Sequence, residues 1–135
     1  MACAGLQWRA PVLVAPILLL GSCFTVRPNA TFSYEKLDPV EYEALLADSA
    51  EHVLIDVRTP AEYRKAHMEG AVNFSYFSFH YGSLVEPLDR SALVFLYCET
   101  CHRSPLAARR MKRMGFRRVV DLRGGHRKWR KTIGQ

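Results

Sequence analysis

The sequence predicts an α/β domain of three layers, in which helices flank a central parallel sheet of about five strands. Two observations support this prediction. Short continuous apolar runs, typical of strands buried on both faces, alternate along the chain with segments that carry helix-start signals. The clearest run, Leu93 to Tyr97, precedes a short loop and a helical pattern. Such alternation favours parallel pairing, because each helix returns the chain to the start of the next strand.

Four of the strands can be placed by residue. They are Val53 to Ile55 within His52 to Val57, Gly70 to Asn73, Leu93 to Tyr97, and Val119 to Leu122. The aromatic-rich segment 74–82 lies between the second and third of these. We expect a loop with a helical turn there.

Helix-start signals occur at several points of the chain. In Asp38-Pro39-Val40-Glu41, an N-cap residue is followed by proline at the first helical position and glutamate at the third. Thr59-Pro60-Ala61-Glu62 repeats this arrangement. Farther along, Ser104 is the expected N-cap and Pro105 the expected first residue of a basic helix. A last short helix carries Trp129.

The N-terminus has the features of an export signal. Residues 1–23 contain one early cation, Arg9, and an apolar stretch from Ala10 to Leu20 that is too short to span a bilayer comfortably. Small residues precede Cys23, as in the lipobox of bacterial lipoproteins, so Cys23 is a candidate for lipidation. Ordinary cleavage nearby and an uncleaved anchor remain alternatives. We expect residues 1–23 to be a signal peptide or anchor, 24–32 a linker, and 33–135 the folded domain of an exported, periplasmic or membrane-anchored protein.

The net charge of +6 is concentrated late in the chain. A basic surface of this kind suits nucleic acid, an acidic membrane or small anions, but it equally suits the solvated faces of two helices. The only late aromatic residues, Phe116 and Trp129, have the pattern of core residues. We therefore favour solvated helix faces and expect no nucleic-acid partner.

A cysteine at the end of the predicted strand 93–97 marks the candidate site. Cys98 begins a short loop that leads into a helix N-terminus. Loop amides and the helix dipole favour negative charge at such a position, and they stabilise a thiolate. Parallel sheets bind ligands at the carboxyl ends of their strands. These points predict that Cys98 is a nucleophile.

Three blocks of sequence, in order and correctly spaced, resemble the rhodanese-like sulfurtransferases. The first, from Leu54 to Asn73, contains the Asp-Val-Arg triplet 56–58. The second, from Tyr97 to Ser104, is similar to the active-site loop C-x-x-G-x-R-S of the family. The third, from Gly115 to Trp129, contains a Gly-Gly pair. The departures from the family pattern are Ala66, Met68, Glu69 and Cys101.

The resemblance implies a sulfur-transfer reaction. In this family the loop cysteine takes a sulfane sulfur from a donor such as thiosulfate, becomes a persulfide, and passes the sulfur to a thiol or cyanide-like acceptor. Carried over, Cys98 is the catalytic nucleophile, loop amides cradle the persulfide, and Arg103 pairs with the oxyanion of the donor. The implied substrate-binding residues are Glu99, Thr100, Cys101, His102, Arg103 and Ser104. No cofactor and no metal ion are expected.

The spacing of the loop separates two chemistries found on this fold. Cys98 and Arg103 form a C-x4-R pattern, the length of sulfurtransferase loops, whereas phosphatases of this fold use C-x5-R. Phosphatase activity is therefore disfavoured. A non-catalytic rhodanese-like module that carries sulfur or recruits a partner stays open as an alternative to the enzyme.

Cys101 introduces further alternatives. It replaces the usual loop glycine, so the loop can require Cys101 to adopt a positive φ. The run from Cys98 to His102 matches the C-x-x-C-H pattern of c-type haem attachment, although a haem would displace much of the surrounding core. Cys101 could also form a disulfide with Cys98, or resolve its persulfide. The remaining alternative is that Cys101 merely fills a loop position.

Five other residues receive structural interpretations. Asp56 and Arg58, at the end of a strand, are expected to form a buried pair or cap more readily than an active-site floor. His67 is expected to pack or hydrogen-bond near a turn. His126 and Trp129 are assigned to the closing helix and the core.

Overall fold

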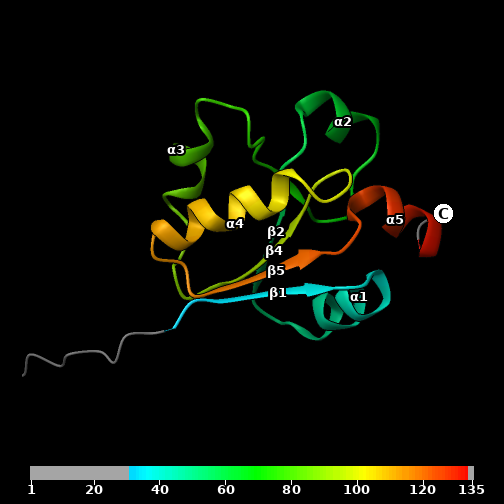
Figure 1. Ribbon diagram of the computed structural model, residues 1–135, viewed down its shortest axis with the longest axis horizontal. Helices are drawn as coiled ribbons and strands as arrows, with labels where there is room; N and C mark the ends of the chain where they lie inside the picture. The colour runs from blue at the N-terminus through cyan, green and yellow to red at the C-terminus, as the bar shows by residue number, and fades with distance from the viewer. Residues whose placement is uncertain (1–30, 134–135) are drawn as a thin grey trace, which may run out of the picture.

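The computed structural model describes residues 31–133 and shows one parallel sheet with helices on both faces (Figure 1). The strand order is β1-β5-β4-β2-β3. The strands are β1 (Ser33–Leu37), β2 (His52–Asp56), β3 (Val72–Asn73), β4 (Leu93–Tyr97) and β5 (Arg118–Leu122). The helices are α1 (Pro39–Asp48), α2 (Pro60–Lys65), α3 (Tyr81–Val85), α4 (Arg103–Arg113) and α5 (Gly125–Thr132). The predicted three-layer α/β fold is confirmed.

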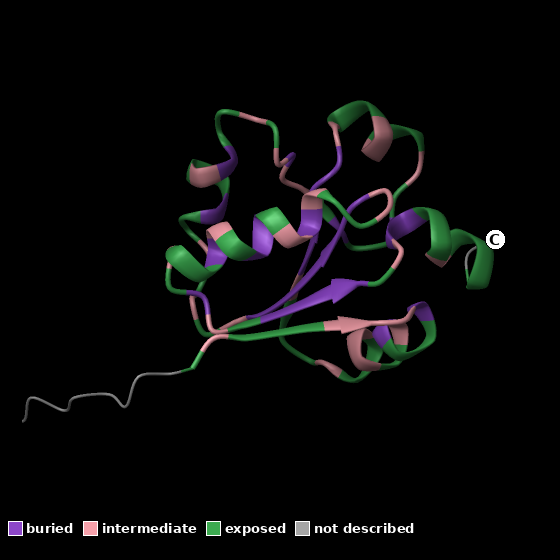
Figure 2. Ribbon diagram, in the orientation of Figure 1, coloured by how far each residue is buried: buried purple, intermediate pink, exposed green. Residues whose placement is uncertain are grey.

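Each face of the sheet has its own apolar core. On the face covered by α3 and α4, Ala107 and Met111 pack with Leu96 of β4. On the opposite face, Tyr42 of α1 packs with Phe95, and the two rings meet edge to face at 5.2 Å between centroids. The central strands are buried, whereas the edge strand β1 is largely exposed (Figure 2).

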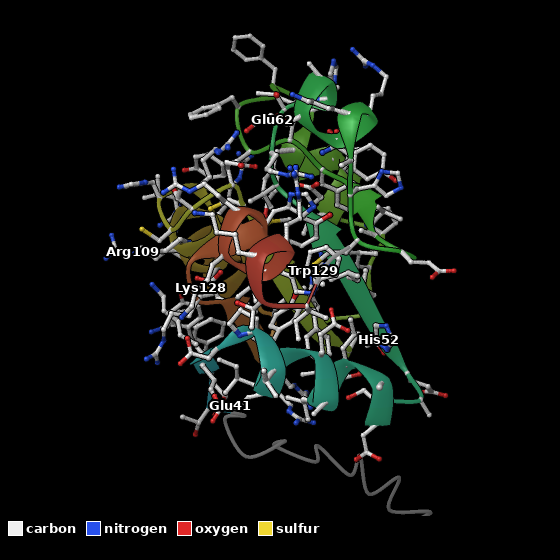
Figure 3. All side chains as sticks on the ribbon, turned by 90° about the vertical axis from the view of Figure 1, so that its right-hand side faces the viewer. Glu41, His52, Glu62, Arg109, Lys128 and Trp129 are labelled. Atoms are coloured by element: carbon white, nitrogen blue, oxygen red, sulfur yellow. The ribbon has the colours of Figure 1, made fainter. Side chains whose placement is uncertain are left out.

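The helix-start signals act as predicted in the first two helices. At α1, the amide of Asp38 donates to the carboxylate of Glu41. At α2, the amide of Thr59 donates to Glu62 Oε2 at 2.9 Å, and the amide of Glu62 donates back to the Thr59 hydroxyl. These reciprocal bonds are those of a capping box. The last predicted helix is α5, which carries Trp129 and lies beside α1, where the Trp129 indole donates to Glu43 (Figure 3).

Three elements differ from the sequence prediction. Strand β1 was not located, because its residues Ser33, Tyr34 and Glu35 are exposed and polar, and an edge strand needs no continuous apolar run. Strand β3 is limited to Val72–Asn73. Helix α4 begins at Arg103 with His102 as its N-cap, so the prediction that Ser104 caps the helix was wrong.

The predicted export signal, the linker up to residue 30 and the candidate lipidation site Cys23 lie outside the described residues. Among residues 31–133, no helix combines the length and the apolar character that crossing a bilayer requires.

Candidate active site

Cys98 lies directly after β4, at the carboxyl end of the sheet. The whole of β4 is buried, and the Cys98 side chain is only 1% exposed. Its sulfur lies 3.4 Å from the hydroxyl of Ser104, which is itself fully buried in the first turn of α4. Because this hydroxyl faces Cys98, Ser104 contacts the candidate nucleophile instead of capping the helix.

The loop after Cys98 has unsatisfied amides. In the described part of the chain, the amides of Glu99, Thr100, Cys101 and His102 donate to no backbone or side-chain acceptor. The N-terminus of α4 follows, where the first amides of a helix also lack partners. A loop of this kind can surround an anion on Cys98 with hydrogen-bond donors.

Helix α5 holds the same loop in place by donating hydrogen bonds to the carbonyl groups of the loop. The amide of His126 donates to the carbonyl of Cys98 at 2.8 Å, and the amide of Arg127 donates to that of Glu99 at 3.1 Å. Gly125, with φ +65°, makes this approach possible, since a Cβ there would lie 2.5 Å from the Cys98 carbonyl oxygen. The carbonyls of Cys98 and Glu99 are thus bonded to α5, while the loop amides named above have no acceptor in residues 31–133.

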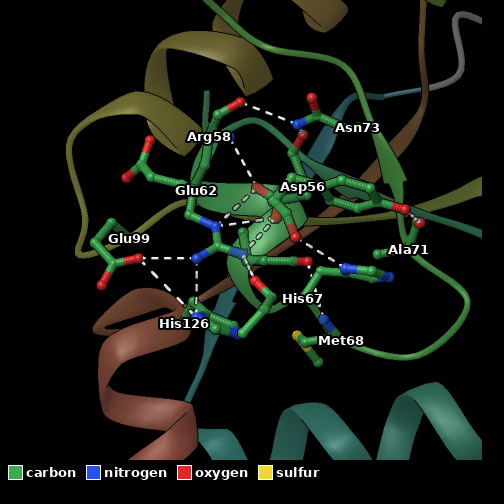
Figure 4. Close-up of polar contacts among 12 residues, drawn as sticks. Asp56, Arg58, Glu62, His67, Met68, Ala71, Asn73, Glu99 and His126 are labelled. Carbon is green, nitrogen blue, oxygen red and sulfur yellow. Dashed lines mark hydrogen bonds and ion pairs between the residues drawn. The ribbon is translucent and has the colours of Figure 1, made fainter. Parts of the chain in front are cut away.

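Arg58 is the centre of a buried polar network beside the loop (Figure 4). Its guanidinium makes a bidentate pair with Asp56, in which Nη2 donates to Oδ2 at 2.7 Å and Nε donates to Oδ1 at 3.1 Å. Nη1 reaches Glu99 at 3.0 Å and His126 Nδ1 at 3.0 Å, while Nη2 also donates to the Ala66 carbonyl. The predicted buried pair is thus present, and it also anchors the loop through Glu99.

The surroundings of His126 disfavour its charged form. Its pKa is lowered, first by burial and then by the neighbouring charge of Arg58. The imidazole lies between the rings of Tyr97 and Trp129, with centroid distances of 5.8 and 5.5 Å. The assignment of His126 and Trp129 to the closing helix and the core is correct, although His126 also contacts the network that holds the loop.

Arg103 pairs with Glu62 of α2. The guanidinium nitrogens Nη1 and Nη2 lie 2.6 and 2.7 Å from the two carboxylate oxygens. The hydrogen bonds of Arg103 outweigh desolvation and lower the pKa of Glu62 to about 2. The resemblance implies that Arg103 binds the donor, and in the structure both of its terminal nitrogens lie at a protein carboxylate.

The outer part of the loop is exposed. Cys101 and His102 face solvent, and the His102 ring lies 3.2 Å from the Thr100 hydroxyl. Cys101 does not adopt a positive φ, since in residues 31–133 only glycines do. The expectation of a left-handed Cys101 was therefore wrong. The glycine that lies close against the loop backbone is Gly125 of α5. His67, by contrast, fits its expected structural role, stacking on Tyr63.

Both loop cysteines are free thiols. Cys98 belongs to the buried core on the α4 face, so attaching a haem to both cysteines would require opening that core. Within residues 31–133, no group of three or more His, Cys, Asp or Glu side chains is placed to hold a metal ion.

Two carboxylates near the loop were not predicted as site residues. Glu62 was recognised only as a helix-start residue, yet it binds Arg103. Asp121 lies in β5, 1% exposed, inside a run assigned as a buried strand. A charged residue within such a run is the signal that could have found it, because a buried charge needs a partner.

Comparison with known proteins defines the class. The model of the rhodanese-like domain family matches residues 38–132, and the chain belongs to this family. The solved structure of a rhodanese-related protein from Thermoplasma volcanium superposes with a TM-score of 0.65 at 19% identity, covering 76% of this chain and 96% of that one.

Two curated relatives carry names related to sulfur. "Putative sulfur carrier protein YrkF" of Bacillus subtilis is 34% identical over 76 residues, which are 56% of this chain and 40% of that protein. "Adenylyltransferase and sulfurtransferase UBA4" of Candida albicans is 28% identical over 100 residues, or 70% of this chain and 23% of that protein. The match thus spans less than half the length of either relative.

Proposed function

We propose that this protein is a thiosulfate-type sulfurtransferase that works through a persulfide on Cys98. The thiolate attacks the sulfane sulfur of the donor, and the S–S bond of the donor breaks with its electron pair leaving on sulfite. A thiol or cyanide then attacks the outer sulfur of the persulfide and releases the Cys98 thiolate.

The observation that carries this proposal is the position of Cys98 beneath a loop of free amides. The amides of Glu99 to His102 have no acceptor in residues 31–133, and the Ser104 hydroxyl lies 3.4 Å from the sulfur. These donors suit a group that bears negative charge on sulfur in both the thiolate and the persulfide. The four-residue spacing between Cys98 and Arg103 favours the same chemistry.

A sulfur-carrier or binding module is the second candidate. It is favoured by the pairing of Arg103 with Glu62, which occupies both terminal nitrogens that an oxyanion of the donor would need. A carrier would receive its sulfur from a protein-bound persulfide and would not need to bind a small anionic donor. The name of the relative YrkF agrees with this candidate.

Mass spectrometry of the full chain after treatment with thiosulfate separates the two candidates. The enzyme gains one sulfur on Cys98 and loses it to cyanide as thiocyanate, whereas a carrier gains it only from a protein persulfide. Cys98→Ser should abolish both reactions, because an alcohol holds no stable persulfide. Persulfide formation on Cys101 in that variant would contradict the assignment of the nucleophile.

We also propose that the protein is exported and held at a membrane surface facing the periplasm. The support is the apolar stretch Ala10 to Leu20 followed by small residues and Cys23. N-terminal analysis of the protein from its native cell should find a chain that begins at or near Cys23, or a retained apolar segment in the membrane fraction. Full-length protein free in the cytoplasm would contradict this proposal.

A further inference from the structure

Asp121 is a buried carboxyl group on the same face of the sheet as Cys98. In β5, Val119 and Asp121 point to one side, because side chains alternate along a strand, and Val119 packs in the core beneath α4. Asp121 is paired in register with Leu96, two residues before Cys98. The sulfur-transfer steps described above do not use this carboxyl.

The two oxygens of Asp121 have different surroundings. Oδ2 accepts a hydrogen bond from the Tyr34 hydroxyl at 2.6 Å, and Lys36 Nζ lies 3.9 Å away. Oδ1 is buried and accepts no hydrogen bond from residues 31–133. The Ser104 hydroxyl is close enough to act on the carboxyl: burial raises the pKa of Asp121, and the hydroxyls of Ser104 and Tyr34 oppose that rise.

Ser104 therefore stands between two groups that need its single proton. Its hydroxyl faces the sulfur of Cys98 at 3.4 Å, which leaves Asp121 Oδ1 without a donor. If Cys98 and Asp121 were both ionised, two buried anions would share one O–H donor, and like charges at close range oppose each other's ionisation. With one proton on either Cys98 or Asp121, each of the three side chains Cys98, Ser104 and Asp121 has a hydrogen-bond partner.

We propose that Cys98 and Asp121 hold one proton between them and exchange it through the hydroxyl of Ser104. When Cys98 ionises, its S–H bond breaks and the proton moves to Ser104 Oγ, while the proton already on that oxygen moves to Asp121 Oδ1. The carboxylic acid then donates to Ser104, and Ser104 donates to the thiolate. No proton leaves the site, and the net charge of the three residues is unchanged.

The charged groups around Cys98, Ser104 and Asp121 do not neutralise both a Cys98 thiolate and an Asp121 carboxylate. Lys36 of the edge strand is the cation near Asp121, but it is half exposed and 3.9 Å away, so solvent screens it. Tyr34 is a neutral donor. On the other side Arg103, which feels the charge of Cys98, is paired with Glu62, and Arg109 acts on Tyr34 from α4. A single negative charge on the pair is the state that these neighbours support.

The test measures the rate at which iodoacetamide labels Cys98 as a function of pH, by peptide mass spectrometry of the full chain. Asp121→Asn removes the competing charge, so labelling below neutral pH should be about tenfold faster and its midpoint should shift to lower pH. In a Ser104→Ala background the same substitution should have a much smaller effect, because the link is gone. Asp48→Asn, at the exposed end of α1, is the matched control and should follow the wild-type profile.

A second variant keeps the proposal testable if Asp121→Asn does not fold. Tyr34→Phe, on the edge strand, removes the donor to Oδ2 and thereby strengthens proton binding by Asp121, so Cys98 should also be labelled faster below neutral pH. A wild-type profile in both variants, or an Asp121→Asn effect that persists in full without Ser104, overturns the shared proton. Because labelling of Cys98 needs no sulfur donor, these outcomes are independent of whether the protein transfers sulfur from thiosulfate.

Discussion

Arg103 and Glu62, 41 residues apart in the sequence, form a two-bond ion pair that joins the first turn of α4 to α2. Two parallel N–H···O bonds fix the plane of the guanidinium as well as its position. Because Glu62 also bonds the backbone of Thr59, the pair connects the helix start at α2 to the end of the active-site loop. The stability of the site depends on this contact, and so does the availability of Arg103 to bind an anion.

The charge of Glu62 should stabilise the fold in a pH-dependent way. Its pKa is lowered to about 2 from its ordinary value of 4.5, mainly by Arg103, so its contribution is present above about pH 4.5 and is lost as the pH falls through about 2. Glu62→Gln keeps the capping geometry but removes the charge. We expect a loss of about 1 kcal/mol near pH 7, or about 4 °C in Tm, for this partly exposed pair.

Thermal unfolding of wild type and Glu62→Gln between pH 7 and pH 2 checks this expectation. The difference in Tm should shrink toward zero at the acid end. Glu69→Gln, at an exposed position, serves as the control for the loss of one carboxylate. A difference that is constant over the whole range would show that packing, and not charge, is responsible.

If Arg103 binds the donor in the sulfurtransferase, Arg103→Ala should mainly raise the apparent KM for thiosulfate. A lost charge-assisted hydrogen bond corresponds to about 1.5–3 kcal/mol, or roughly ten- to a hundredfold. Arg103→Lys keeps the charge without the planar fork, so its apparent KM should lie between those of wild type and Arg103→Ala. Unchanged KM and kcat in the alanine variant would mean that Arg103 serves Glu62 alone, which favours the carrier.

Gly125 should be intolerant of a side chain because it supports the active-site loop. A Cβ there would lie 2.5 Å from the Cys98 carbonyl oxygen and 2.6 Å from that of Thr100, so Gly125→Ala must push the loop away from α5. Gly70→Ala is the matched control, since Gly70 has a similar φ of +76° but open space around it. We expect the control to lose about 1–2 kcal/mol of stability from backbone strain, with persulfide formation intact.

Persulfide formation on Cys98 and the free energy of unfolding, both measured on the two glycine variants, test this difference. Gly125→Ala should lose more stability than the control, and its rate of persulfide formation should fall by at least about tenfold as the cradle is displaced. Equal losses of stability with equal rates would mean that the loop adjusts to the added methyl group.

The fold could be predicted from the sequence where local signals and burial agree. The capping boxes at Asp38 and Thr59 set helix starts that the structure confirms, and the apolar run of β4 identifies a strand buried throughout. Strand β1 lacked such a signal, because its place depends on pairing with β5 and not on its own apolar residues.

The site was predictable in part for a similar reason. The family's loop pattern pointed to Cys98, which lies directly after β4 as predicted, but the contacts between distant segments were not visible in any local pattern. The Glu62–Arg103 pair and the approach of Asp121 to Ser104 arise only when α2, α4 and β5 meet at one end of the sheet. The N-cap at Ser104 failed because a tertiary contact with Cys98 occupies its hydroxyl.

Cys101 is where the loop departs most clearly from the family pattern. Cys98 is buried and Cys101 exposed, and both are free thiols three positions apart. A disulfide between them would draw the sulfur of Cys98 away from Ser104 and remove the free thiol that the proposed sulfur transfer needs. We therefore expect low sulfur transfer in the oxidised protein and recovery with a mild reductant, whereas Cys101→Gly should need no reductant.

The competing possibility is that Cys101 assists turnover by attacking the Cys98 persulfide, which forms the disulfide and releases the outer sulfur as sulfide. In that case Cys101→Gly should hold a longer-lived persulfide and should release less sulfide, with or without reductant. Cys101→Ser separates loss of the thiol from any added flexibility of glycine, and the absence of a positive φ at this position means that serine fits the same backbone. Assays of the three proteins with thiosulfate, each before and after reduction, distinguish these outcomes. If wild type and both variants behave alike under both conditions, Cys101 only fills its place in the loop, and neither redox role is correct.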